Sequence, residues 1–212
     1  PEVAVPAFLN QSPKTIKYLS SLLPNETYLL LGSLRIEEEK IFNSLYLLSS
    51  KGVIDYYDKL KLVPFGEFIP FRNILSLKKI TDGKRDFSRG LDRKTMHLNI
   101  KGRIIKIEPS ICYEGIFPEK KIIGEDSNIL INITNDAWFG NYAGPLQHLT
   151  HVRYRTIETG LPMIRSTNKG YSVLINPIGQ ITESIPRNEL NFIEFEIPNR
   201  LDKTIYSKFK DW

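Results

Sequence analysis

The sequence is poor in the residues that disulfides and metal sites need. Its 212 residues include one cysteine, Cys112, and three histidines, at 97, 148 and 151. A single cysteine cannot form an internal disulfide, so Cys112 is either a small buried hydrophobic residue or a nucleophile. His148 and His151 lie three apart on a predicted helix without a third ligand motif. We therefore interpret them as helix-surface residues and predict no metal site.

Long apolar runs and blocks of one charge are also missing. No run approaches the roughly 18 to 20 apolar residues that a membrane helix needs. The first residues, PEVAVPAFLN, lack the pattern of a signal peptide, and we expect the chain to be a piece of a longer protein. The 29 basic and 24 acidic residues are interspersed and sum to +5, which favours a phospholipid surface over nucleic acid as a partner.

The hydrophobic pattern predicts an α/β fold in one globular domain, residues 1–212, because the chain is long enough to bury one sizeable core. Apolar and β-branched runs predict strands, and Lys101-Gly102 predicts a tight turn between two of them. An apolar stripe that ends at Gly160 predicts a helix. The predicted strands are 28–36, 41–50, two within 95–112, 128–134, 171–179 and 191–198, and the predicted helix is 146–160.

Cys112 stands where an apolar strand runs into YEGIFPE, in which Gly115 and Pro118 break the pattern. A strand-to-turn junction of this kind exposes a side chain above the sheet edge and leaves backbone N–H groups to face an oxyanion. A thiol with an ordinary pKa needs a base or a cation beside it to act as a nucleophile. The histidine spacing does not identify such a base, and a buried core cysteine remains the alternative.

The stretch YYDKLKLVPFGEFIPF places two lysines and Glu67 among aromatic residues. A carboxylate in so apolar a setting indicates a functional role, since burial without a partner is costly. The alternative is a half-exposed strand that ends in a turn. Lys59 and Lys61 are two apart on this predicted strand, so periodicity places both on one face and cannot choose between them.

Three segments in succession carry a family resemblance, namely DKLKLVPFGEFIP, SICYE, and TNDAWFG followed by GPLQHLTHVRYRTIETGLPMIRSTNKG. Together they resemble the carbon–nitrogen hydrolase domain of the nitrilase superfamily, most closely its membrane-bound branch, the apolipoprotein N-acyltransferases. The resemblance spans nearly the whole chain. It implies a nitrilase-like α-β-β-α sandwich, here expected to lack its first strand.

The resemblance implies a Glu-Lys-Cys triad. The CYE motif places the nucleophile at Cys112, and the family lysine, eight residues before the glutamate of VPFGE, selects Lys59. The family glutamate follows a Trp-Pro pair, which matches Glu2 in PEVAVP, although the tryptophan is missing here. Glu2 is then the general base, and Lys59 stabilises the oxyanion together with the backbone N–H of Tyr113.

Further site residues also follow from the resemblance. Glu67 and Glu114 are expected as supporting carboxylates that fix Lys59 and the local proton balance. Tyr113 and Trp138 match aromatic positions that line the acyl pocket, and Trp138 is the predicted substrate-binding residue. Core packing is the alternative interpretation for these two aromatic side chains.

The implied reaction transfers an acyl chain from a phospholipid, through a thioester on Cys112, to the N-terminal amine of a diacylglyceryl-cysteine apolipoprotein. No cofactor and no nucleic acid are expected to take part. The implied location is the periplasmic face of the bacterial inner membrane, as a domain of an integral membrane protein. Two alternatives remain open, a soluble nitrilase-type amidase that acts on a small amide or nitrile, and an inactive remnant that binds lipid.

Overall fold

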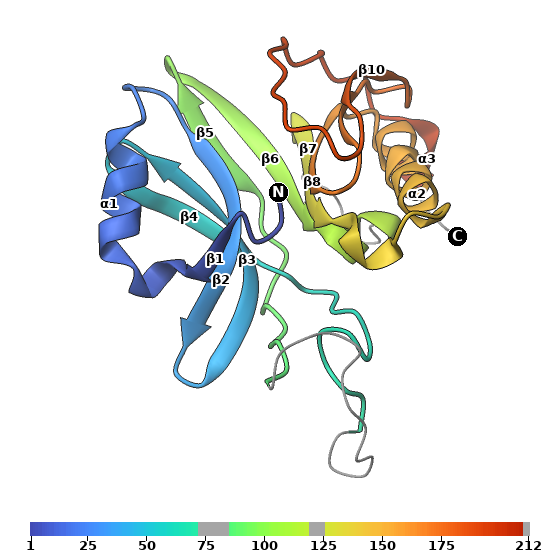
Figure 1. Cartoon of the computed structure of the whole chain (residues 1–212). Coiled ribbons are helices and arrows are strands. Elements are labelled where there is room, and N and C mark those ends of the chain that lie inside the picture. Colours follow the sequence, from blue (N-terminus) through green and yellow to red (C-terminus); the bar gives the residue numbers. More distant parts are fainter. Residues whose placement is uncertain (72–84, 119–125, 210–212) are drawn as a thin grey trace. The chain divides into compact units, whose positions relative to one another are not determined.

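The computed structural model describes residues 1–71, 85–118 and 126–209, which form two compact units (Figure 1). The N-terminal unit is Val3–Arg93, and the C-terminal unit is Lys94–Trp212 together with Pro1–Glu2. Each unit contains one sheet and few helices. Among residues 1–71, 85–118 and 126–209, every helix is too short or too polar to span a lipid bilayer. The single domain over 1–212 stays a prediction.

The N-terminal unit is built on a four-stranded sheet. Its elements are β1 (Val5–Phe8), η1 (Leu9–Gln11), α1 (Pro13–Ser21), β2 (Leu29–Glu37), β3 (Lys40–Ser49) and β4 (Gly52–Asp58). The strand order is β1-β2-β3-β4, with β1 parallel to β2 and the other neighbours antiparallel. Strands β2 and β3 confirm the two strands predicted at 28–36 and 41–50, and the charged residues between them lie at the hairpin turn.

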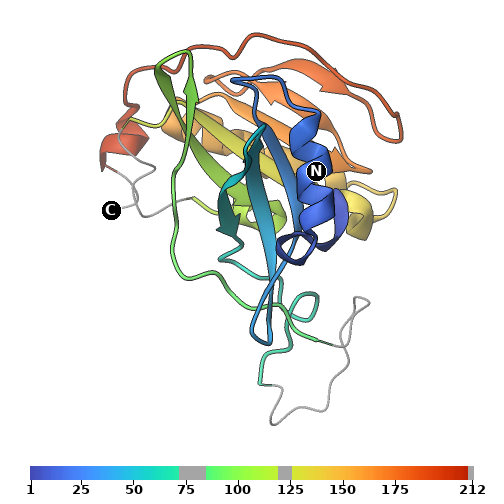
Figure 2. The same cartoon turned by 90° about the vertical axis from the view of Figure 1, so that its left-hand side faces the viewer.

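Helix α1, which the sequence analysis did not predict, covers one face of this sheet (Figure 2). It begins at Pro13, a residue that suits the first helical turn because its missing N–H would have no partner there. Ile16 and Leu19 from the helix pack against the buried Leu9 and Leu31. Burial of each leucine side chain contributes about 1.5 to 3 kcal/mol to the free energy of folding, so this cluster stabilises the packing of the helix on the sheet.

The C-terminal unit contains a six-stranded mixed sheet in the order β10-β9-β8-β7-β6-β5. Its elements are β5 (Met96–Ile100), β6 (Arg103–Ile111), η2 (Cys112–Ile116), β7 (Ile129–Asn135), η3 (Asp136–Phe139), α2 (Gly144–Thr159), β8 (Met163–Asn168), β9 (Ser172–Ile175), β10 (Ile181–Ile185) and α3 (Ile205–Phe209). The predicted turn is confirmed: Lys101 and Gly102 have φ values of 51° and 79°, as a type I′ hairpin turn requires.

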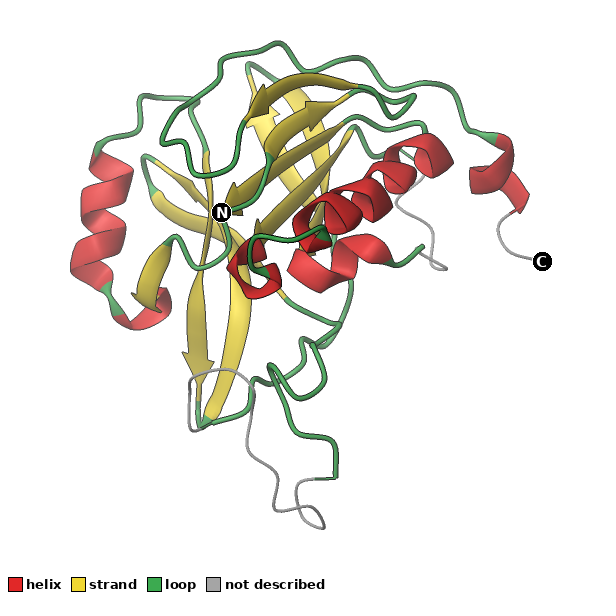
Figure 3. Cartoon of the chain, turned by 45° about the vertical axis from the view of Figure 1, so that its right-hand side comes forward, coloured by secondary structure: helices red, strands yellow, loops and turns green. Residues whose placement is uncertain are grey.

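Helix α2 lies along the six-stranded sheet (Figure 3). Leu149 and Val152 pack against Leu130 and Met163 of the sheet, and all four side chains are buried. The helix ends at Thr159, and Gly160 is the residue that stops it, as predicted; Gly160 has a φ of 69° and its N–H donates to the carbonyl O of Thr156 at 2.8 Å. Strand β7 is almost wholly buried, as expected for a strand covered on both faces.

The topology of this sheet gathers three strand ends. Strands β6, β7 and β8 are parallel neighbours, with Ile111 opposite Ile133 and Asn135 opposite Asn168. Their carboxyl ends therefore lie at one edge, which is where α/β sheets commonly place their sites.

One predicted strand is wrong. Residues 191–198, NFIEFEIP, form no strand, although their alternation is typical of one. Phe192, Ile193 and Phe195 line a cavity instead of pairing with the sheet. Alternation of apolar and polar residues is a local pattern, and it does not show whether a neighbouring strand is available for pairing.

Candidate active site

Cys112 lies at the junction between β6 and the short helix η2, as predicted. Its backbone has a φ of 52°, in the left-handed region that is unfavourable for a residue with a Cβ. Such a conformation costs about 1 to 3 kcal/mol and persists where the surroundings hold it, often at reactive positions. The residue is only 7% exposed, so the thiol is more enclosed than the sequence analysis predicted.

Polar side chains hold the main chain on both sides of Cys112. The N–H of Ile111 donates to Oε2 of Glu114 at 2.8 Å, and Nε2 of His148 lies 3.3 Å from the carbonyl O of Cys112. Glu114 is buried. This predicted supporting carboxylate therefore contacts the main chain beside the thiol, and its part in the proton balance stays a prediction.

Gly115 explains why η2 packs so closely on the sheet and on α2. A Cβ at this position would lie 2.9 Å from Nδ2 of Asn132 and 3.0 Å from Cγ2 of Val152. A side chain there would push the turn that carries Cys112 away from β7, so glycine is required by space.

Glu2 is buried at the same edge of the six-stranded sheet. Its Oε2 accepts a hydrogen bond from the N–H of Asn135 at 2.8 Å, and its carbonyl O accepts one from Nδ2 of Asn168 at 3.0 Å. Asn135 and Asn168 are the last residues of β7 and β8. Because Cys112 follows the last residue of parallel β6, the predicted base and nucleophile lie at neighbouring strand ends.

Lys59 and Glu67 form an ion pair in the N-terminal unit. Nζ of Lys59 lies 2.9 Å from Oε1 of Glu67, and the lysine side chain is 1% exposed. The carboxylate also accepts from Nδ2 of Asn43 at 3.3 Å and from the N–H of Val63 at 2.8 Å. These contacts fix the lysine head group, and buried charges are stable in proteins when they are paired in this way.

The expectation that Lys59 and Lys61 share one face of a strand is wrong. Strand β4 ends at Asp58, so neither lysine belongs to it. Lys59 is buried, with its N–H bonded to the carbonyl O of Asn43 and its carbonyl O to the N–H of Gly90, both at 2.9 Å. Lys61 is half-buried. The chain turns after β4, and this turn removes the two-residue periodicity on which the expectation rested.

A buried charge cluster, which the sequence analysis missed, lies next to Cys112. Oδ1 of Asp136 lies 2.8 Å from Nδ1 of His148, and Oδ2 accepts from Nη2 of Arg165 at 2.8 Å. Arg165 also donates to Oδ1 of Asn132. All four residues are buried, so the interpretation of His148 as a helix-surface residue is wrong. His151 is exposed, as predicted.

A sequence signal for His148 does exist. It lies four residues before Val152 and next to Leu149, on the side of the helix that carries the apolar stripe. No group of three His, Cys, Asp or Glu side chains within the described ranges is arranged to hold a metal. A histidine on an apolar helix face indicates a buried polar partner, which is here Asp136.

Electrostatics couple this cluster to the predicted active-site groups. Burial by itself raises the pKa of Asp136, but the hydrogen bond from His148 and the charge of Arg165 outweigh it, so that pKa lies below its ordinary value. Burial lowers the pKa of Arg165, while the negative charges of Asp136, Cys112 and Glu2 oppose that change. Arginine nevertheless remains protonated in proteins. The attraction between Arg165 and a Cys112 thiolate is mutual.

The two predicted aromatic residues differ in their environment. Trp138 lies in η3 and is 61% exposed, so core packing is wrong for this residue. Tyr113 is half-buried, and its ring meets that of Phe117 edge-on at a centroid distance of 4.8 Å. An exposed tryptophan beside the strand ends is available to an apolar ligand, and its substrate role stays a prediction.

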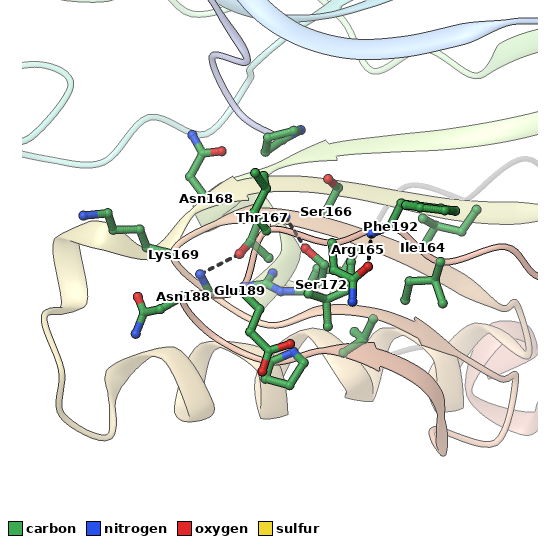
Figure 4. Close-up of a pocket in the computed structure, with 18 of the residues that line it drawn as sticks. Ile164, Arg165, Ser166, Thr167, Asn168, Lys169, Ser172, Asn188, Glu189 and Phe192 are labelled. Atoms are coloured by element: carbon green, nitrogen blue, oxygen red, sulfur yellow. Dashed lines mark hydrogen bonds between the residues drawn. The ribbon is translucent and has the colours of Figure 1, made fainter.

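A cavity of about 840 Å³ opens beside β8 and β9 (Figure 4). The apolar part of its wall includes Ile164, Val173, Leu190 and Phe192. Thr167 lies at its polar side, where its Oγ1 accepts the N–H of Gly170 at 2.7 Å and its own N–H donates to Oγ of Ser172 at 3.1 Å. The cavity is large enough for a small-molecule ligand.

Comparisons with known proteins match nearly the whole chain. The family model for carbon-nitrogen hydrolase matches residues 3–206. An apolipoprotein N-acyltransferase of Rhodopseudomonas palustris is 36% identical over 98% of this chain and 40% of its own length. One of Rickettsia prowazekii is 39% identical over 92% of this chain and 40% of its own length. The chain therefore spans about two fifths of these relatives.

A structural comparison gives the same fold. A CN-hydrolase superfamily protein from Xanthomonas campestris superimposes with a TM-score of 0.61 at 20% identity, over 90% of this chain and 73% of that chain. At this identity the likeness bears on the fold alone. It confirms the nitrilase-like α/β fold class predicted from the sequence.

Proposed function

We propose that this chain, which belongs to the carbon–nitrogen hydrolase family, carries the acyl-transfer chemistry of an apolipoprotein N-acyltransferase. The observation that carries the proposal is its likeness, over nearly all of its residues, to the two bacterial relatives of that name. The acyl donor is a phospholipid, and the acceptor is the N-terminal amine of a diacylglyceryl apolipoprotein. The reaction takes place at the periplasmic face of the bacterial inner membrane.

In the first step, Cys112 attacks the acyl ester of the phospholipid. Glu2 takes the thiol proton, and the thiolate forms a C–S bond to the ester carbonyl carbon. The ammonium of Lys59 and the N–H of Tyr113 stabilise the oxyanion. The tetrahedral intermediate then collapses, the C–O bond breaks, and Glu2 returns the proton to the departing lysophospholipid oxygen. The left-handed backbone of Cys112 supports the assignment of this residue as the nucleophile.

In the second step, the amine of the diacylglyceryl-cysteine attacks the thioester carbon. Glu2 accepts a proton from the amine, the C–S bond breaks, and the thiolate of Cys112 recovers a proton from Glu2. Glu67 holds the head group of Lys59, which its ion pair at 2.9 Å supports. Glu114 holds the main chain before Cys112, and Trp138 contacts the acyl chain.

The test is a product assay with the complete gene product. It is incubated with phosphatidylethanolamine and a diacylglyceryl peptide that has a free N-terminus, and the peptide is analysed by mass spectrometry. We expect an N-acylated peptide and an equal amount of lysophospholipid, with neither in Cys112→Ser. Hydrolysis of a small amide without acylation of the peptide would contradict the proposal and favour an amidase. A protein that binds lipid but performs neither reaction would be an inactive remnant.

A further inference from the structure

A buried histidine connects the charge cluster to the main chain of the proposed nucleophile. Nδ1 of His148 lies 2.8 Å from Oδ1 of Asp136, and Nε2 lies 3.3 Å from the carbonyl O of Cys112. His148 is 4% exposed, and its ring packs against that of Phe139 at a centroid distance of 5.4 Å. The two acyl-transfer steps described above use none of these contacts.

The partners of the imidazole determine where it carries a proton. A carbonyl oxygen only accepts, so the contact with Cys112 is attractive only if Nε2 of His148 bears a hydrogen. On the other side of the ring, Nδ1 faces both the carboxylate of Asp136 and, at 3.2 Å, Nη2 of Arg165. If Nδ1 accepts from Arg165, a neutral ring carries its one hydrogen on Nε2; if Nδ1 donates to Asp136, the contact with Cys112 requires a hydrogen on both ring nitrogens. In both arrangements the attractive contact has a hydrogen on Nε2 directed at Cys112.

The peptide group after Cys112 links this contact to catalysis. The C=O of Cys112 and the N–H of Tyr113 belong to one planar peptide unit and point in opposite directions. A side chain that fixes the carbonyl therefore also fixes the direction of the Tyr113 N–H. That N–H is the second oxyanion donor of the proposed mechanism, and an oxyanion donor acts only when it is aimed before the reaction begins.

We propose that His148 is a positioning residue that aims the Cys112–Tyr113 peptide at the oxyanion. The inference rests on the proposed function for the roles of Cys112 and Tyr113. The histidine is itself held firmly. Asp136 accepts hydrogen bonds from Thr134 at 3.2 Å and from Arg165 at 2.8 Å. Buried networks with this many partners are rigid.

The close approach of Gly170 adds to this rigidity. A Cβ at Gly170 would collide with Oδ2 of Asp136 and with Oγ1 of Thr167. The turn that follows β8 therefore packs closely against the carboxylate of Asp136, which orients His148. The imidazole has little freedom to leave Cys112.

Two substitutions separate the two ring nitrogens. Counted in bonds from Cβ, the amide nitrogen of glutamine corresponds to Nε2 of histidine, and that of asparagine corresponds to Nδ1. His148→Gln thus keeps a donor toward Cys112, whereas His148→Asn keeps only the donor toward Asp136. The matched control is His151→Asn, the same change on the exposed part of the same helix.

Two reactions of Cys112, measured on the complete gene product, separate oxyanion stabilisation from thiol access. Acylation by p-nitrophenyl acetate forms an oxyanion, whereas alkylation by iodoacetamide does not. We expect His148→Asn to slow acylation by about 100-fold, as misplacement of a catalytic group by about 1 Å does, and to leave alkylation nearly unchanged. His148→Gln should recover most of the acylation rate, and His151→Asn should match the wild type.

Equal slowing of both reactions would overturn the proposal, because it indicates general loosening of the site. A failure of His148→Gln to recover acylation would also overturn it. If wild-type Cys112 is alkylated but never acylated, the proposed nucleophile is wrong, and the histidine contact is then judged by nuclear magnetic resonance.

That measurement uses the wild-type protein labelled with ¹⁵N-histidine, so it does not depend on whether any variant folds. We expect Nε2 of His148 to carry a proton that exchanges slowly with water, because the group is buried and bonded. His97 and His151 provide the exposed comparison signals. A ring nitrogen without a proton at Nε2 of His148 would overturn the positioning role.

Discussion

Replacing Lys59 by methionine is expected to destabilise the folded chain and to abolish acyl transfer. The lysine side chain is 1% exposed, and its Nζ lies 2.9 Å from Oε1 of Glu67. Methionine occupies a similar space without the charge, so the change isolates the ion pair from packing. Lys61→Met is the matched control, since Lys61 is half-buried and lies two residues away.

The magnitude follows from the geometry of the pair. At 2.9 Å and an effective dielectric constant of about 20, two unit charges attract by about 6 kcal/mol, before the cost of desolvation. Removal of one partner from a buried pair typically costs about 3 to 5 kcal/mol. Glu67 keeps hydrogen bonds from Asn43 and Val63 and a side-chain exposure of 12%. We therefore expect a loss of about 3 kcal/mol, at the lower end of that range.

The double variant distinguishes stability from catalysis. Lys59→Met combined with Glu67→Gln removes both charges and should recover most of the free energy of unfolding, measured by urea denaturation. It should not recover acyl transfer, because loss of an oxyanion donor costs about 100- to 1000-fold in kcat. Lys59→Met that is no less stable than Lys61→Met would contradict a stabilising ion pair, and activity regained in the double variant would contradict the role of Lys59 as an oxyanion donor.

Three further outcomes are expected. In the folded chain the pKa of Asp136 lies below its ordinary value. The carboxylate therefore contributes stability at neutral pH, and this contribution is lost as the pH falls through the folded pKa. In unfolding curves, Asp136→Asn should be less stable than the wild type at pH 7 and should lose less stability on acidification. Gly160→Ala should lose about 1 to 2 kcal/mol, because φ is 69° and a Cβ would lie 3.2 Å from the carbonyl O of Asp202; an unchanged melting temperature would contradict this. Cys112 should react with iodoacetamide in the folded protein and more slowly in Lys59→Ala, whereas protection until denaturation would indicate an inert core cysteine.

Much of the sheet structure could be predicted because its signals are local. The hairpin around Lys101 and Gly102 follows from turn chemistry, and β7 follows from an uninterrupted run of apolar and β-branched residues. The position of Cys112 at a strand end follows from the same local pattern. Helix α1 was missed because its apolar residues are few and the stretch is short.

The polar contacts of the site could not be predicted by local reasoning. Asn135 bonds to Glu2 across 133 positions of sequence, and His148 meets Cys112 across 36. Periodicity indicates which face of a helix or strand is apolar, but it does not indicate which buried polar side chain packs against that face. For this reason the sequence predicts a surface position for His148, whereas the structure buries it. The separation of Lys59 from Lys61 likewise depends on a turn that alternation does not reveal.

In the proposed reaction, Cys112 carries the acyl chain as a thioester. The most direct measurement is the intact mass of the complete gene product after incubation with a phospholipid and no amine acceptor. We expect one added acyl chain on the wild type, removed by hydroxylamine, discharged by a diacylglyceryl peptide with a free N-terminus, and absent in Cys112→Ser. A protein mass without an added acyl chain, under conditions in which the peptide is nevertheless acylated, would contradict the thioester on Cys112.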